Sequence, residues 1–135
     1  MTKKYVKAFI AGMAFPALFL PLAFTALFCL NHHVQHHALF FAPMYLPLVF
    51  GIANMLYIKM IEGMPAKNAN SALWTVGIFL GFIVALLGVF VIHVPTIVFG
   101  STNSDVIYAP LIVLPLIYGI VFRYIVKWLN KLLSV

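Results

Sequence analysis

Residues 8–30, AFIAGMAFPALFLPLAFTALFCL, decide the fold, because they form an apolar run without a charged side chain. A bilayer core about 30 Å thick is crossed by about 20 apolar residues in a helix. Three further stretches meet that length, at residues 38–58, 72–92 and 106–130. A helix satisfies its own backbone hydrogen bonds in lipid, where water is absent. The sequence therefore predicts an all-α integral membrane protein, a four-transmembrane-helix bundle that forms one domain over residues 1–135.

The composition favours the same class. Of the 135 residues, 65% are hydrophobic and 7% are charged, with a formal net charge of +6. Soluble domains carry about 25% charged residues, so an ordinary soluble domain and a disordered chain are both excluded. The single cysteine excludes a disulfide framework within the chain. No stretch resembles a nucleic-acid-binding module, and we expect no nucleic-acid partner.

Lysine and arginine gather on one side of the predicted bundle. All eight lie at the two ends of the chain or in the joint between the second and third spans. Basic residues that flank membrane spans are retained in the cytoplasm. Both termini are therefore expected in the cytoplasm, with the chain in a bacterial inner membrane. The eight residues are Lys3, Lys4, Lys7, Lys59, Lys67, Arg123, Lys127 and Lys131.

Three of these basic residues are expected on one face of the last helix. Arg123, Lys127 and Lys131 are spaced four apart, which places their side chains above one another on a helix. Such a face can extend its charges to anionic lipid headgroups. It can equally form a docking strip for a cytoplasmic partner, and the sequence leaves both roles open.

An internal repeat relates the second and fourth spans. Residues 46–52, LPLVFGI, match residues 114–120, LPLIYGI, and the same offset aligns Lys59 with Lys127. The match can arise by chance in an apolar chain, or from duplication of a helical hairpin. Duplication would give two tandem parallel hairpins related by an axis along the membrane normal.

The third span carries small residues every four positions, at Gly77, Gly81 and Ala85. Small residues at this spacing let the backbone of a second helix approach closely. We expect the third span to be tightly packed. The sequence does not decide whether its partner is another helix of this chain or a second copy, and a homo-oligomer is one expected assembly.

Histidines gather on the opposite, predicted outer side of the membrane. Neutral imidazoles bind Zn, Cu and Ni, and two of them spaced four apart on a helix can hold one ion. Other interpretations remain open: a solvated interfacial turn without a ligand, a pH-responsive surface, a haem held between two histidines, or part of a di-iron histidine box. The candidate metal ligands are His32, His33, His36, His37, His93 and Asp105.

The middle of each predicted span lacks charged side chains, which argues against a proton-coupled pump. Asn54 is the most informative polar residue there, and we assign it to a candidate solute path. The competing role is a hydrogen bond to a neighbouring helix, which is common for asparagine in membranes. No nucleophile, base and orienting acid form a plausible triad, so we do not expect an enzyme.

Two functional hypotheses follow from these features. The first is a channel or transporter that admits a metal ion or other small solute at a histidine-rich extracytoplasmic mouth. Its candidate ligand is a transition-metal ion (Zn, Cu or Ni), and no other cofactor is expected. The second is a non-catalytic accessory or assembly subunit of a larger membrane complex. In both cases the lipid bilayer is the environment of the chain.

Overall fold

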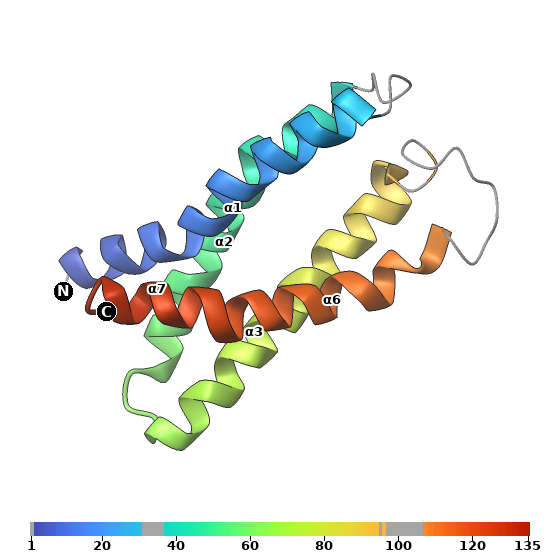
Figure 1. The fold of residues 1–135 in the computed structure, drawn as a ribbon. Coiled ribbons are helices and arrows are strands. Elements are labelled where there is room, and N and C mark those ends of the chain that lie inside the picture. The colour runs from blue at the N-terminus through green and yellow to red at the C-terminus, as the bar shows by residue number, and fades with distance from the viewer. Residues whose placement is uncertain (1, 31–36, 95, 97–106) are drawn as a thin grey trace.

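The computed structural model describes residues 2–30, 37–94, 96 and 107–135. These described residues form four long helices (Figure 1). The first is α1 (Thr2–Leu30) and the second is α2 (His37–Ile61). The third is α3 (Ala66–Leu86), which continues as the π-helical turn η1 (Leu87–Val91). The fourth runs through α6 (Pro110–Ile120), the π-helical η2 (Val121–Val126) and α7 (Lys127–Leu132).

Three of the helices contain segments long and apolar enough to cross a membrane. These segments are Lys3–Ala26, Asn68–Val91 and Pro110–Leu132. The apolar part of α2 with described side chains, Tyr45–Ile61, is shorter. Large apolar side chains point outward at high exposure, 72% for Leu18 and 70% for Ile112, as lipid-facing positions do. The prediction of an all-α chain with apolar helices is confirmed, and these helices indicate a helical membrane protein.

The four helices associate as two pairs. α1 packs along α2, and α3 packs along α6 and η2. The pairs meet through α2 with α3, and through α1 with η2 and α7. Figure 1 shows the pairs close together near the two termini and diverging toward their opposite ends. Burial in α1 follows this arrangement, since it ends at Pro16 and none of residues 17–26 is buried.

Glycines set the spacing of the helices within each pair. A β carbon added to Gly12 in α1 would lie 2.5 Å from the carbonyl oxygen of Phe50 in α2. A β carbon added to Gly77 in α3 would lie 2.6 Å from the carbonyl oxygen of Tyr118 in α6. Both distances are shorter than van der Waals contact, so only glycine permits this approach. The small-residue stripe of the third span therefore packs against α6 of the same chain.

The two glycines have corresponding surroundings. Each faces a carbonyl oxygen, the Cα of a glycine and the Cβ of a larger residue on the partner helix. The residues of the second set lie 68 positions after those of the first, which is the offset between LPLVFGI and LPLIYGI. The first set is Phe50, Gly51 and Asn54, and the second is Tyr118, Gly119 and Phe122.

An aromatic ring also occupies the same place in both pairs. The Phe9 ring lies against Gly51, and the Trp74 ring lies against Gly119. Trp74 is 65 residues after Phe9, and Gly77 is 65 residues after Gly12. The contacts therefore align α3 with α1, although the third span has no proline to match those of the first.

Aromatic side chains fill the space where the two pairs meet. The Phe50 ring centroid lies 4.9 Å from that of Tyr118 and 5.3 Å from that of Phe122. Such ring pairs contribute about 0.5–1.5 kcal/mol beyond the area that they bury. Phe50 and Tyr118 hold corresponding positions in the two pairs, and their rings are in contact where the pairs meet.

An ion pair connects the first turn of α1 to the turn after α2. Lys4 Nζ lies 3.0 Å from Glu62 Oε1, and the Tyr5 hydroxyl donates to Glu62 Oε2 at 2.9 Å. The hydrogen bonds from Lys4 and then from Tyr5 lower the pKa of Glu62. Both members of the ion pair are exposed, so its contribution to stability is small.

The glycine contact predicts that a glycine-to-alanine substitution has different effects on stability at two positions of the third helix. Gly77→Ala should lower the free energy of unfolding by about 1–3 kcal/mol, because the added methyl group meets backbone atoms that cannot move aside. Gly88→Ala is the matched control, since its β carbon would meet only Val94, at 3.9 Å. It should be neutral or slightly stabilising. Unfolding of the reconstituted chain by a denaturing detergent measures both, and equal effects would contradict the assigned contact.

The ion pair predicts a pH response at the N-terminal end of α1. The pKa of Glu62 is lowered in the folded chain, so the contact stabilises the fold at neutral pH and is lost as the pH falls through that lowered pKa. Hydrogen exchange in the second turn of α1, whose amides donate to the carbonyl oxygens of the first turn, should rise relative to the intrinsic rate on acidification to about pH 3. Glu62→Gln should show the higher exchange already at neutral pH. An unchanged pH profile in that variant would assign the response to other groups.

Candidate functional site

The predicted histidine-rich mouth falls mostly outside the described residues. His32, His33, His36 and Asp105 lie there, and of His37 only its place at the start of α2 is described. His93 is exposed and follows η1 with a left-handed φ of 57°. Within the described part of the chain, no group of three or more His, Cys, Asp or Glu side chains is placed to hold a metal ion. The proposed metal ligands therefore stay a prediction.

Asn54 lies at the centre of a buried polar contact between the two pairs. Its side chain is 0% exposed, and its Nδ2 donates to the Ala8 carbonyl oxygen at 2.7 Å and to Asn130 Oδ1 at 2.7 Å. Asn130 Nδ2 donates back to Asn54 Oδ1 at 3.0 Å. Both amide hydrogens and the amide oxygen of Asn54 are therefore used by the protein. These bonds join α1, α2 and α7, and the solute path through Asn54 remains a prediction.

The packing of α1 makes this contact possible. A β carbon on Gly12 would lie 2.7 Å from the Asn54 Cβ, so glycine admits Asn54 to the α1 backbone. Sequence analysis missed the partner, Asn130, because it lies in the mixed polar end of the fourth helix. A position on an apolar helix face is the signal that could have identified Asn130 from the sequence. The structure shows that Asn130 holds such a position, because it is 7% exposed within a largely exposed segment.

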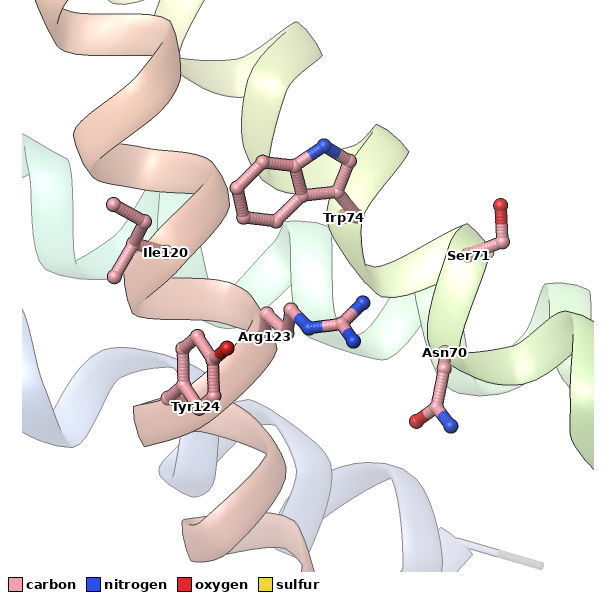
Figure 2. A pocket seen from close by; sticks show the side chains of 6 residues that line it. All are labelled: Asn70, Ser71, Trp74, Ile120, Arg123 and Tyr124. Atoms are coloured by element: carbon pink, nitrogen blue, oxygen red, sulfur yellow. The ribbon is translucent and has the colours of Figure 1, made fainter.

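A second polar site lies between α3 and the fourth helix. It is a groove of about 650 Å³ with cationic, amide, hydroxyl and indole groups along its walls. Figure 2 shows the Arg123 guanidinium extending from η2 toward α3, below the Trp74 ring. We call this site the cationic groove, and its lining residues are Asn70, Ser71, Trp74, Ile120, Arg123 and Tyr124.

A smaller hollow of about 300 Å³ continues the cationic groove along α7. The predicted basic face lines it, since Arg123, Lys127 and Lys131 all border the hollow together with Tyr124 and Trp128. The wall contributed by α3 was not predicted, because the sequence did not reveal which helix packs beside the basic face.

Two contacts hold the basic side chains in and beside the cationic groove. Lys127 Nζ donates to Asn70 Oδ1 at 2.7 Å, which ties the fourth helix to α3. The Arg123 Cζ lies 5.8 Å from the centroid of the Tyr124 ring, within the range of a cation–π contact. This set of donors is suited to binding an anion. No known protein family, curated protein or solved structure matches the chain.

The asparagine pair predicts a coupled effect on stability. Asn54→Leu and Asn130→Leu should each lower the free energy of unfolding by about 1–3 kcal/mol, because each leaves a buried amide without its partner. The double variant should lose less than the sum, with a coupling energy of about 0.6–1.7 kcal/mol. Unfolding of the parent, the two single variants and the double variant in the same micelles measures this coupling energy. Additive losses would show that the two amides do not depend on each other.

Proposed function

We propose that this protein is a non-catalytic accessory or assembly subunit of a larger membrane complex, built from two tandem parallel copies of one helical hairpin. The closed interface between the pairs carries this proposal. In transporters made of repeats, the solute site lies at the repeat interface near the bilayer midplane. Here the Phe50 ring is in tilted contact with the rings of Tyr118 and Phe122 at that interface, and the amides of Asn54 and Asn130 are hydrogen-bonded to each other.

The chain surface supports a role in assembly. Toward the ends opposite the termini, the pairs diverge and their helices carry apolar side chains at high exposure, 72% for Leu22 and 68% for Val91. In lipid, helices associate through shape and close packing rather than through exclusion of water. In a membrane complex, an apolar helix of a partner subunit can take the place of lipid against these exposed apolar side chains.

The proposal includes an orientation. Both termini face the cytoplasm of a bacterial inner membrane, and the loops between the helices of each pair face the outside. The distribution of all eight lysine and arginine residues supports this arrangement. The ion pair of Lys4 with Glu62 agrees with it, since it holds the first turn of α1 beside the turn after α2.

Transport is the second candidate, and one observation favours it. The pairs diverge toward the loops that carry the predicted metal ligands His32, His33, His36, His37, His93 and Asp105. In this alternative, a Zn, Cu or Ni ion or another small solute enters there. The aromatic contact and the Asn54–Asn130 pair would then form the closed inner end of the path.

One purification and two assays separate the two candidates. The accessory role predicts that the full chain, extracted from its native membrane in mild detergent, elutes in fixed stoichiometry with a defined membrane protein. It also predicts no metal flux in proteoliposomes and no specific heat of Zn, Cu or Ni binding by calorimetry. A lone homo-oligomer with metal binding and flux that are lost when all five histidines become alanine would overturn the accessory role in favour of transport.

A further inference from the structure

The first helix pair serves as an internal reference for the second. The contacts at Gly12 and Gly77 match positions of the two pairs at offsets of 65 residues for α3 and 68 residues for the fourth helix. These offsets, extended along the sequence, give every position of the cationic groove a counterpart in α1 or α2. The counterparts of Trp74 and Ile120 are also apolar, Phe9 and Ile52. The polar positions differ, because Asn70, Ser71 and Arg123 stand where the first pair carries Tyr5, Val6 and Met55.

The difference between the two pairs shows which side chains of the groove are not needed for helix packing. The first pair makes the same close glycine contact with a thioether at the position of Arg123 and an isopropyl group at that of Ser71. A cation and a hydroxyl are therefore unnecessary for packing two helices in this way. Arg123 is exposed in the groove between α3 and η2, and its planar guanidinium there is suited to a ligand of opposite charge.

The charge of the cationic groove is not balanced by the described protein. In the described part of the chain, the ion pair found joins Lys4 to Glu62, on the other helix pair. The only other acidic residue of the chain, Asp105, lies outside the described residues in the loop that precedes α6. The Arg123 guanidinium meets the Tyr124 ring, and Lys127 meets an uncharged amide. Among the described residues, neither Arg123 in the groove nor Lys127 beside it has an acidic partner.

The cationic groove changes from apolar to polar along its length. Ile120 is followed, toward the middle of the fourth helix, by the exposed apolar residues Ile117 and Leu116. Toward the chain terminus, Arg123 is followed by Lys127 and Lys131. Tryptophan and tyrosine at the level of these cations are typical of the boundary between lipid chains and headgroups. One molecule that matches both halves of the groove is a phospholipid with an anionic headgroup.

We infer that the cationic groove binds an anionic phospholipid of the leaflet that faces the chain termini. Arg123 donates to the phosphate through its planar guanidinium, and Lys127, held by Asn70, adds a second positive charge. Ser71 lies on the opposite wall of the groove, within the same lining. The acyl chains lie along Ile120 and the apolar face beyond it. This site is independent of whether the protein assembles or transports.

The chain carries its own reporters for this site. Its two tryptophans are Trp74, which lines the cationic groove, and Trp128, which lines the adjoining hollow. Bromine on a lipid chain quenches a tryptophan that it contacts. In the Trp128→Phe background, Trp74 alone reports the lipid in the cationic groove. The full chain is reconstituted in phosphatidylcholine vesicles that contain either brominated phosphatidylglycerol or brominated phosphatidylcholine as the minor component.

Trp74 should be quenched more strongly by brominated phosphatidylglycerol than by brominated phosphatidylcholine. Arg123→Met installs the residue of the corresponding position in α2, so the packing is preserved. It should weaken the preference for phosphatidylglycerol about tenfold, the loss expected for a charged hydrogen bond. Lys59→Met is the matched control, because Lys59 corresponds to Lys127 and its loss removes one positive charge away from the groove. It should leave the preference unchanged.

Three outcomes would overturn the inference. Equal quenching by the two lipids in the parent would exclude an anionic lipid and leave the groove to another partner. An equal effect of Lys59→Met and Arg123→Met would assign the preference to diffuse surface charge. Relief of the quenching by soluble glycerol phosphate would show that a free phosphate, rather than a lipid, is the ligand. Circular dichroism of each variant checks that the helices are retained.

Discussion

The absence of a β carbon at Gly12 and Gly77 is the constraint on which the rest of this structure depends. Apolar helices in lipid gain little from leaving their solvent, so they associate where their backbones can approach. At both glycines the partner helix presents a carbonyl oxygen that a methyl group would displace. Each pair is therefore fixed at short range, and the surfaces outside these contacts are free to differ between the pairs.

Outside the glycine contacts, polar side chains occur in two places, one buried between the pairs and one on the surface of the second pair. The buried amides of Asn54 and Asn130 satisfy each other and the Ala8 carbonyl oxygen, so they hold the pairs together. Arg123 of the fourth helix is exposed beside Trp74, and its guanidinium extends from η2 toward α3 (Figure 2). The buried polar groups thus hold the helices together, whereas the exposed polar groups can bind a ligand.

Much of the fold could be predicted from the sequence, because helix formation in lipid depends on length and apolar character alone. The run at residues 8–30 and the match of LPLVFGI with LPLIYGI required no structure. The alignment of α3 with α1 could not be predicted, since it rests on which atoms face Gly12 and Gly77 rather than on residue identity. Asn54 was recognised but Asn130 was not, because a contact between positions 76 residues apart leaves no local pattern. The histidine ligands remain predictions, since convergence of side chains from two loops is invisible in a sequence.

The asparagine pair also has a consequence for biosynthesis. Ribosomes deliver the chain from its N-terminal end, so α1 and α2 enter the membrane before the helix that carries Asn130 exists. Until then the amide oxygen of Asn54 lacks its donor, and the nascent first hairpin holds an unmet polar group in lipid. Arrival of the last helix removes that defect. The fourth helix, which is synthesised after the other three, therefore completes the contact between the pairs. A quality-control protease that acts before this step would meet the first three helices without that contact.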